Sequence, residues 1–301
     1  MRSIKTILFG VMLLAATLSQ AADKVAVVAS FSILGDIVRQ VGGDRVNVTA
    51  LVGPDQDAHV FQPAPDDVKT VARAKLVVVN GLGFEGWLSR LIDAAHYRGQ
   101  VLVASSGIAA RERKDDGDAH AGTALHYDPH AWQDPSNVMV YTRNIMAVLS
   151  KLDPAGAATY ERNGHAYLQQ LAELDRWAQQ QLAQIPADKR KIITSHDAFG
   201  YFGAHYHVAF LAPQGKSTDA EPSARDVARL IRQMKAEKIK AVFMENMSDP
   251  RLLRQISREA GTEVGGKLYP DALSAAGGDA PSYLAMMRFN IGQMLSGLRK
   301  N

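Results

Sequence analysis

Short apolar runs alternate along this chain with segments in which apolar residues recur every three or four positions. Short apolar runs bounded by turn residues are typical of buried strands, and the spacing of three and four is typical of helices. The strands predicted in the first half of the chain are residues 25–31, 46–52, 76–80 and 101–104. The helices predicted between them are residues 33–41, 68–74 and 87–95. Strands that alternate with helices favour parallel sheets flanked by helices, the α/β class.

The middle of the chain predicts two consecutive helices, each beginning at an Asp-Pro pair. Asp134-Pro135 precedes a helix that ends near residue 152, and Asp153-Pro154 precedes a longer one that ends near residue 185. Proline suits the first helical position and an acid suits the position before it, so both pairs favour a helix start. Apolar residues form one continuous stripe along the second helix: Leu168, Leu171, Leu174, Ala178, Leu182 and Ile185. Such a stripe predicts a helix that packs along one face.

The α/β alternation resumes after this helix. The predicted strands are residues 192–195, 208–211, 241–244 and 264–268, and the predicted helices are residues 223–237, 250–260 and 281–298. We therefore predict two α/β lobes, each with a mainly parallel sheet flanked by helices, joined by one long rigid linker helix. The predicted boundaries are residues 23–153 for the N-terminal lobe, 154–186 for the linker helix and 187–301 for the C-terminal lobe.

Residues 1–22 have the features of a secretory signal peptide. The basic residues Arg2 and Lys5 precede a short apolar run over residues 7–16, and small residues follow up to Ala22. This order is typical of a cleaved export signal. The apolar run is shorter than the roughly 20 apolar residues that a membrane-spanning helix needs. We expect a protein that is exported to the periplasm.

The composition of the chain argues against several classes of binding partner and several types of site. The chain carries 34 Lys and Arg against 31 Asp and Glu, scattered among one another, so no basic patch indicates nucleic-acid binding. It contains no cysteine, which excludes a disulfide framework, a thiolate metal site and a cysteine that carries a lipid. We expect a monomer that is not anchored in the membrane, in which any metal site uses His, Asp or Glu.

Four side chains that bind metals follow predicted strands. His59 follows strand 46–52, His130 lies in the loop after strand 101–104, His196 follows strand 192–195, and Asp271 follows strand 264–268, as read from the sequence. Ligands of open parallel sheets bind outside the carboxyl ends of the strands. Because each predicted lobe supplies two of the four residues, we expect them to converge in the cleft between the lobes.

Three imidazoles and one carboxylate form a donor set for a divalent transition metal. Four nitrogen and oxygen ligands suit Zn²⁺, which is the metal that we predict. Mn²⁺ and Fe²⁺ remain alternatives, because a carboxylate that binds through both oxygens would allow a fifth coordination bond.

Other interpretations of these residues remain open at this stage. Each histidine taken alone also fits a packed or surface position. A periplasmic zinc hydrolase is the main alternative function, although catalytic zinc usually has three protein ligands and one open position. A scaffold or adhesin that merely contains a metal is a third class. Ser195, His196 and Asp197 are consecutive in the sequence, which argues against a hydrolase triad, because triads form by spatial convergence.

Several loops carry runs that resemble one known family. These runs are Asp57-Ala-His59-Val-Phe-Gln-Pro63, Val79-Asn-Gly-Leu-Gly-Phe-Glu-Gly-Trp-Leu88, Asp128-Pro-His130-Ala-Trp-Gln-Asp-Pro135 and Ser195-His196-Asp197-Ala-Phe-Gly. In this order they resemble the metal-binding solute receptors of ABC importers, the ZnuA/TroA-like group. The resemblance covers nearly the whole chain after the predicted signal peptide.

The resemblance implies a function and a ligand set. It implies a receptor, not an enzyme, that captures a divalent metal in the periplasm and delivers it to a membrane permease. It implies ligands at His59, His130, His196 and Asp271. Members with glutamate at the third ligand position resemble manganese or iron binders, so His196 at that position favours zinc.

Neighbouring residues are candidates for supporting roles. The candidate acids for orienting the imidazoles are Asp57, Asp128, Asp197 and Glu245, although each also fits the commoner role of a cap or surface acid. Trp132 and Phe61 are expected to wall the cleft or to belong to the ordinary core, and glycine pairs on either side of the Asp271 loop suggest that this loop is a gate. Residues 115–126 hold His120, His126 and three acids, where zinc receptors of the group often have a long His-rich loop. This segment is either a weak secondary capture site or a solvated loop.

Overall fold

A computed structural model describes residues 24–112 and 127–301 of the chain. The predicted signal peptide and the Asp/His segment 115–126 lie outside the described residues. Within the described part of the chain, no helix is both long enough and apolar enough to cross a membrane.

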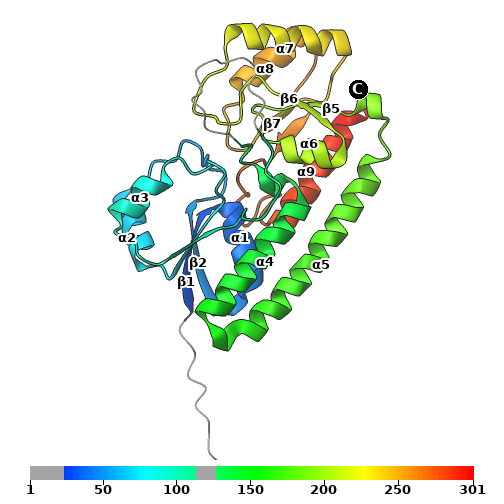
Figure 1. Ribbon diagram of the computed structural model, residues 1–301. Coiled ribbons are helices and arrows are strands. Elements are labelled where there is room, and N and C mark those ends of the chain that lie inside the picture. The colour runs from blue at the N-terminus through cyan, green and yellow to red at the C-terminus, as the bar shows by residue number, and fades with distance from the viewer. Residues whose placement is uncertain (1–23, 113–126) are drawn as a thin grey trace, which may run out of the picture.

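The N-terminal lobe is built on a parallel sheet with strand order β2-β1-β3-β4 (Figure 1). Its strands are β1 (Val25–Phe31), β2 (Val46–Val52), β3 (Leu76–Val79) and β4 (Gln100–Val103). β1 and β3 lie in the middle of the sheet and are mostly buried, which fits their continuous apolar sequences. The flanking helices are α1 (Ser32–Gly42), α2 (Pro65–Arg73), α3 (Leu88–Ala94) and α4 (Pro135–Leu152). Figure 1 shows α1 and α4 on one side of the sheet and α2 and α3 on the other.

The C-terminal lobe repeats this strand order with much shorter strands. Its strands are β5 (Lys191–Ile193), β6 (Ala209–Leu211), β7 (Phe243–Glu245) and β8 (Gly266–Leu268). β5 pairs with β6 and β7 pairs with β8, both in parallel, and a parallel bridge from Ile193 to Val242 joins the two pairs. The resulting order is β6-β5-β7-β8, in which the second strand again lies outside the first. The helices are α6 (Gly200–Tyr206), α7 (Ala224–Glu237), α8 (Arg251–Ala260) and α9 (Tyr283–Leu298).

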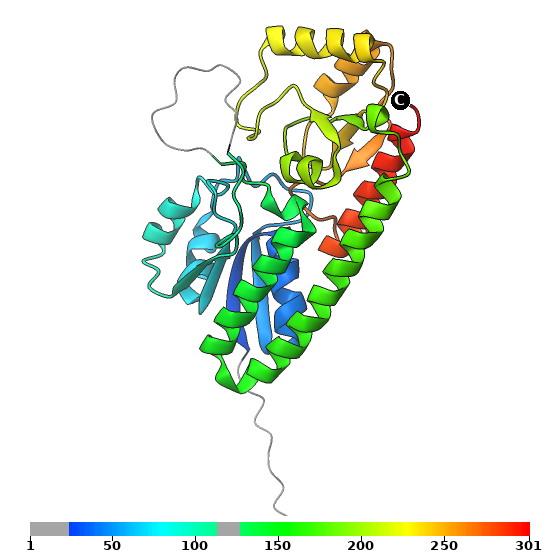
Figure 2. The ribbon, with the colours of Figure 1, turned by 45° about the vertical axis from the view of Figure 1, so that its right-hand side comes forward.

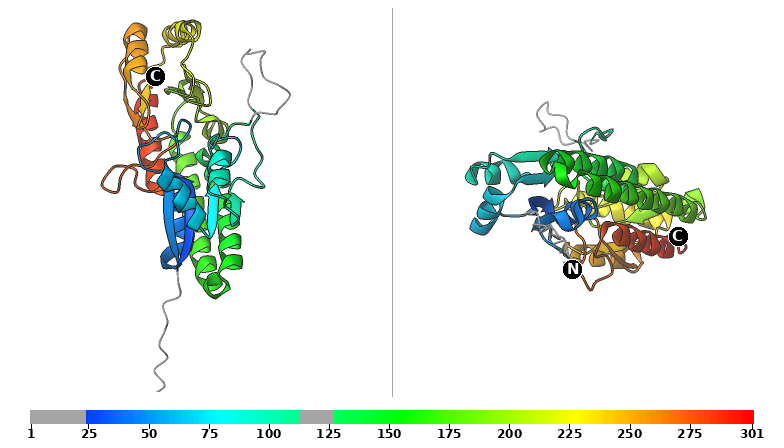
Figure 3. Two further views of the ribbon diagram at one scale, coloured as in Figure 1. Left: turned by 90° about the vertical axis from the view of Figure 1, so that its left-hand side faces the viewer. Right: turned by 90° about the horizontal axis from the view of Figure 1, so that it is seen from below.

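One long helix connects the two lobes. α5 (Ala157–Leu182) has 26 residues and is therefore about 39 Å long. It packs against α1 and α4 of the N-terminal lobe and against α6 and α9 of the C-terminal lobe. Figure 2 shows it alongside both lobes, and the left view of Figure 3 shows one lobe above the other. Its predicted apolar stripe faces inward, where Leu171, Leu174, Ala178 and Leu182 are buried.

A single apolar core extends through both lobes. Residues of the N-terminal sheet, of α5 and of α9 belong to one continuous cluster, which also contains Phe199 and Phe243 of the C-terminal lobe. A smaller second cluster lies under α7 and α8. A shared, close-packed core resists large rearrangement, so wide hinge bending between the lobes would require breaking it.

The predicted fold class is confirmed, with differences in detail. Helix α6 was not predicted, because the short segment Gly200–Tyr206 is glycine-rich and aromatic and has no periodic apolar stripe. The strands of the C-terminal lobe were predicted one to three residues too long or displaced, for example 241–244 where β7 is Phe243–Glu245.

Candidate metal centre

The four predicted ligands lie together where the two lobes meet. One ligand atom from each of His59, His130, His196 and Asp271 lies within 4.8 Å of the other three. Each residue follows the carboxyl end of a strand: β2, β4, β5 and β8 respectively. Parallel strands with the same order in both lobes aim these ends at one another, so the topology brings together residues far apart in sequence.

The separations between ligand atoms match those around one small cation. Nε2 of His59 lies 3.3 Å from Nε2 of His130 and 3.4 Å from Oδ2 of Asp271. Nε2 of His196 lies 3.1 Å from Oδ2 of Asp271, and Nε2 of His130 lies 3.7 Å from Oδ1. Atoms bound at about 2.0–2.1 Å to a tetrahedral ion lie about 3.3 Å from one another. The spacing therefore suits one ion among the four side chains.

Three of the converging atoms are buried without a hydrogen-bond partner among the described residues. They are Oδ1 and Oδ2 of Asp271 and Nε2 of His196. A buried polar atom without a partner costs roughly 1–3 kcal/mol, and more when it is charged. Because both oxygens and the nitrogen point into the same space, a cation there would satisfy all three.

His130 is oriented by a carboxylate that also holds a lysine. Its Nδ1 lies 2.9 Å from Oδ1 of Asp128, which leaves Nε2 to face the centre. Oδ2 of Asp128 forms an ion pair at 2.8 Å with Nζ of Lys216, from the other lobe. Burial would raise the pKa of Asp128, but its hydrogen bond to His130 and the charge of Lys216 lower that pKa to about 2. Gly200 permits this close arrangement, because a side chain there would collide with the Asp128 carboxylate.

His196 is oriented by a carboxylate whose other partners are uncharged. Its Nδ1 lies 2.7 Å from Oε2 of Glu245, at the end of β7. The same carboxylate accepts hydrogen bonds from the backbone N–H groups of Ser195 and His196 and from the hydroxyl of Ser248. These bonds fix the loop as well as the imidazole, leaving Nε2 as the free ring nitrogen.

The two buried imidazoles have opposite pKa shifts. Burial is the strongest influence on His130 and lowers its pKa, despite the carboxylates nearby. Burial also opposes the charged form of His196, but the charges of Glu245 and Asp271 hold its pKa well above the ordinary value. Burial would raise the pKa of Asp271, but the charges of His196 and His130 keep it well below its usual range.

His59 is positioned through its backbone. Its N–H donates to Oδ1 of Asp57 at 2.9 Å, a short turn that His130 repeats with Asp128 at 3.1 Å. Asp57 thus supports the loop and does not contact the imidazole ring. Asp57 therefore has the capping role that its place in the sequence also allowed. Asp197 is likewise not a partner of a ring nitrogen, because its carboxylate pairs with Lys216 at 2.7 Å.

Aromatic rings enclose the N-terminal side of the centre. Trp132 lies edge-on to His130 with ring centroids 5.3 Å apart, as expected for a wall of the cleft. Phe84 packs against His59 at 4.8 Å, a contact that was not predicted from the sequence. Phe61 instead packs on Trp87, so its predicted place beside the ligands is wrong.

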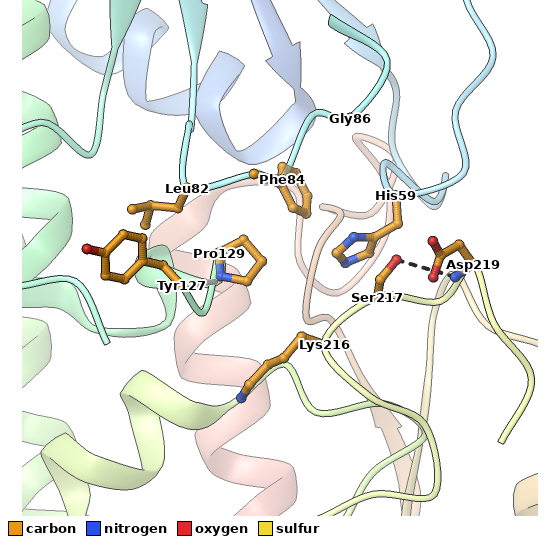
Figure 4. Close-up of a pocket in the computed structure, with 10 residues that line it drawn as sticks. His59, Leu82, Phe84, Gly86, Tyr127, Pro129, Lys216, Ser217 and Asp219 are labelled. Atoms are coloured by element: carbon orange, nitrogen blue, oxygen red, sulfur yellow. Dashed lines mark hydrogen bonds between the residues drawn. The ribbon is translucent and has the colours of Figure 1, made fainter. Parts of the chain in front are cut away.

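The centre opens towards one pocket of about 430 Å³. Of the four candidate ligands only His59 lines it, and Figure 4 shows the His59 ring between Phe84 of one lobe and Ser217 of the other. The side chains of the other three ligands are fully buried. An ion would therefore approach the centre past His59.

The Asp271 loop is fastened to the N-terminal lobe on both sides. The carbonyl of Pro270 accepts hydrogen bonds from the side chains of Trp132 and Gln133, at 2.8 and 2.6 Å. The N–H of Leu273 donates to the hydroxyl of Ser32, at 3.0 Å. Residues 269–274 are buried throughout. The segment expected from its flanking glycines to be a gate is thus among the more firmly held parts of the site.

Comparison with known proteins agrees with this architecture. A model of the family described as zinc-uptake complex component A, periplasmic, matches residues 27–297. The chain is 34% identical over 280 residues to the manganese-binding lipoprotein MntA of Halalkalibacterium halodurans, covering 93% of this chain and 90% of the relative. It is 32% identical over 282 residues to the iron-binding protein YfeA of Yersinia pestis, covering 93% of this chain and 88% of that relative.

A solved structure has the same fold. The periplasmic zinc-binding protein TroA of Treponema pallidum matches with a TM-score of 0.82 at 28% identity, covering 91% of this chain and 99% of the other. The family resemblance predicted from the loop sequences is thereby confirmed. This chain is a member of the family of periplasmic zinc-uptake components.

Proposed function

We propose that this protein captures one divalent transition metal ion in the periplasm and delivers it to the membrane permease of an ABC importer. The observation that carries the proposal is the convergence of His59, His130, His196 and Asp271 within 4.8 Å, with the buried Asp271 oxygens lacking hydrogen-bond partners among the described residues. In this proposal each imidazole binds through Nε2 and Asp271 supplies the only charged ligand.

The supporting carboxylates fit a cation as cargo. Asp128 and Glu245 hold the Nδ1 atoms of His130 and His196, which directs both Nε2 atoms inward and increases their basicity. The carboxylates of Asp271, Asp128 and Glu245 outnumber the ammonium of Lys216 beside the centre. This excess of negative charge favours binding of a cation.

We propose Zn²⁺ as the cargo, because three imidazoles and one carboxylate suit this ion best. Mn²⁺ and Fe²⁺ are the alternatives: the relatives named above are described as manganese-binding and iron-binding, and TroA as zinc-binding. Both oxygens of Asp271 face the imidazoles, so a five-coordinate arrangement is also compatible with the distances.

We propose binding without catalysis. Four protein ligands occupy the coordination positions of a tetrahedral ion and leave none for a reactive water. The shared core favours small movements during uptake, so release at the permease would involve local change around the site. The predicted signal peptide fits a protein that is exported and acts in the periplasm.

Native mass spectrometry tests this function. Protein purified from the periplasm without added metal should carry one ion, and His196→Ala should carry none. Competition between Zn²⁺ and Mn²⁺ for the wild-type protein should leave Zn²⁺ bound. Retention of Mn²⁺ would change the proposed cargo, and a wild-type protein without tight metal uptake would refute the receptor function.

A further inference from the structure

One segment of the C-terminal lobe contacts all three histidine-bearing loops. This segment, residues 214–218, has no regular secondary structure and is named the strap below. It lies beside His196 in the same lobe and reaches across to the loops of His59 and His130 in the other lobe.

The strap is joined to the His196 loop by backbone hydrogen bonds. The N–H of Gln214 donates to the carbonyl of Ser195 at 3.3 Å, and the N–H of Asp197 donates to the carbonyl of Gly215 at 3.1 Å. These bonds form an isolated parallel bridge between His196 and Gln214, so the strap and the His196 loop run side by side there.

Lys216 connects the strap to the His130 loop. Its ammonium pairs with Asp128 at 2.8 Å and with Asp197 at 2.7 Å, and its side chain is only 16% exposed. Asp128 accepts both the backbone N–H and the ring Nδ1 of His130 through its other oxygen. The Lys216 ammonium therefore acts on His130 through one intervening carboxylate.

Thr218 makes the equivalent connection to the His59 loop. Its hydroxyl donates to Oδ2 of Asp57 at 2.6 Å, and Oδ1 of Asp57 accepts the N–H of His59. The same arrangement therefore precedes both histidines of the N-terminal lobe. An aspartate two residues earlier accepts a hydrogen bond from the histidine with one carboxylate oxygen and contacts a strap side chain with the other.

The strap is held differently from the Asp271 loop. Residues 269–274 are buried and fastened by hydrogen bonds to the other lobe, whereas the strap residues are half-buried or exposed and are held by polar contacts. Segments with few buried apolar contacts open at low free-energy cost. Of the two, the strap is the segment suited to local opening.

The strap also forms a wall of the approach to the metal centre. Lys216 and Ser217 of the strap, and Asp219 just after it, line the pocket of about 430 Å³ on the side opposite Phe84, and His59 lies between these two walls (Figure 4). A second pocket of about 500 Å³ is also lined by the strap, through Gln214 and Thr218, and by Asp57 of the His59 loop. Because the strap lines both pockets, its displacement would widen the approach to His59.

We infer that the strap gates the metal centre, and that Lys216 and Thr218 are positioning residues that hold it closed over His59 and His130. The inference rests on the proposed function, since it concerns passage of the ion to the same four ligands. Opening requires only that two polar bridges between the lobes break, without disruption of the shared core. A gate of this kind changes the rates of uptake and release together and leaves the affinity nearly constant.

Variants that break the bridges without changing the net charge of the site test this inference. Thr218→Val removes one hydroxyl and keeps the shape of the side chain. The double variant Lys216→Met with Asp197→Asn removes one positive and one negative charge. Stopped-flow fluorescence with Zn²⁺ alone gives the association rate, and excess chelator gives the dissociation rate. Both rates should rise about 10-fold in each variant, as expected for loss of a hydrogen bond to a charged group. Kd should be little changed in Thr218→Val, which leaves every charge near the ligands in place.

Matched controls lie in the same lobe, away from the strap. Thr262→Val and Lys235→Met should leave both rates at the wild-type values, because neither side chain contacts the strap or a ligand loop among the described residues. Lys216→Arg, which keeps the charge and can pair with both carboxylates, should preserve slow release.

Four results would overturn the gate. The first is that the bridge-breaking variants have the Tm of wild type and also its association and dissociation rates. The second is that these variants change Kd without changing the association rate. The third is that wild type takes up the ion at the diffusion limit, because no opening step would then slow its association. Hydrogen exchange on wild type provides a test without variants: strap amides should exchange faster than those of residues 272–274, and equal protection would contradict the inference. Failure of the proposed function is separate, because wild type would then bind no ion.

Discussion

The two lobes contribute unequal halves to one metal centre. The N-terminal half holds His130 through Asp128, whose charge Lys216 offsets, and the pKa of this imidazole is lowered. The C-terminal half holds His196 through Glu245, which accepts only uncharged donors besides the imidazole, and there the pKa is raised. The same pairing of a buried imidazole with a carboxylate thus gives opposite proton affinities, because the surrounding charges differ.

This difference suggests a division of roles in metal uptake. Burial favours the neutral form of His130, which is the form that binds a metal, whereas the charges of Glu245 and Asp271 favour the protonated form of His196. Metal ligands must be deprotonated, so binding has to displace the proton on the C-terminal side. That side also supplies the only anionic ligand, and we expect it to dominate both affinity and pH dependence.

Asp271→Asn should produce the largest loss. It removes the one charged ligand while keeping the size of the side chain, and a quarter of the free energy typical of a four-ligand zinc site corresponds to a loss of about 100- to 1,000-fold in affinity. Competition with a chelator of known affinity measures the change. Asp279→Asn, an exposed neighbour on the same loop, is the control and should bind like wild type. A loss of less than tenfold for Asp271→Asn would show that the carboxylate is not a ligand.

Glu245→Gln should weaken binding more than Asp128→Asn does. Partners that orient a ligand typically contribute 10- to 100-fold in affinity, and we expect about 100-fold for Glu245 and about 10-fold for Asp128. Glu245 is fully enclosed, whereas the charge of Asp128 is screened by Lys216, which is partly exposed to solvent. Isothermal titration of the two variants gives the order directly. Equal losses of affinity in the two variants, or a larger loss in Asp128→Asn, would mean that the charge on Lys216 does not reduce the contribution of Asp128.

Metal affinity should rise with pH beyond the range of an ordinary imidazole. Because the pKa of His196 is raised, its proton competes with the metal at neutral pH, and affinity increases by up to about tenfold per pH unit until that pKa is passed. Calorimetry in buffers with different ionisation enthalpies should detect proton release at pH 7. Glu245→Gln should move the profile to lower pH. An affinity that is flat above pH 6.5 would contradict a protonated His196.

A histidine far from the ligands gives the smallest predicted effect. His205 of α6 contacts Asp175 of α5 at 2.7 Å and Asp134 at the start of α4 at 3.4 Å, so it links the lobes away from the metal. The hydrogen bond to Asp175 raises the pKa of His205. Its stabilisation is therefore fully present below the unfolded pKa near 6.5 and is lost as pH rises through the folded pKa.

His205→Gln should accordingly lower Tm by about 2–4 °C at pH 6 and by less at pH 9, with metal affinity unchanged. Thermal unfolding in the two buffers measures the difference. His165→Gln, at an exposed position on α5, serves as the control and should leave Tm near the wild-type value. A drop in Tm for His205→Gln that is the same at both pH values would exclude the ionic contribution.

Much of this architecture is predictable from local sequence patterns. The apolar run of β1 and the apolar-rich segment of β2 predicted both strands with the bounds found in the structure, and Asp134-Pro135 marked the start of α4. The meeting of the four candidate ligands also follows from their places after parallel strands. These features depend on periodicity and topology, which a single sequence contains.

Contacts between side chains far apart in sequence were less predictable. Asp197 is next to His196 in sequence but pairs with Lys216 of the same lobe, whereas the imidazole is oriented by Glu245, which was one of four candidate acids. The strap has no apolar pattern and reads as an ordinary polar loop. Its partners lie in a lobe whose placement depends on the whole core, so no local signal in the sequence reveals them.

The most direct test of the metal centre is a crystal structure of the Zn²⁺-loaded protein with anomalous scattering at the zinc edge. We expect one strong peak about 2.0–2.2 Å from Nε2 of His59, His130 and His196 and from at least one oxygen of Asp271. A peak elsewhere in the molecule, or an ion that leaves any of these four side chains beyond bonding distance, would contradict the account.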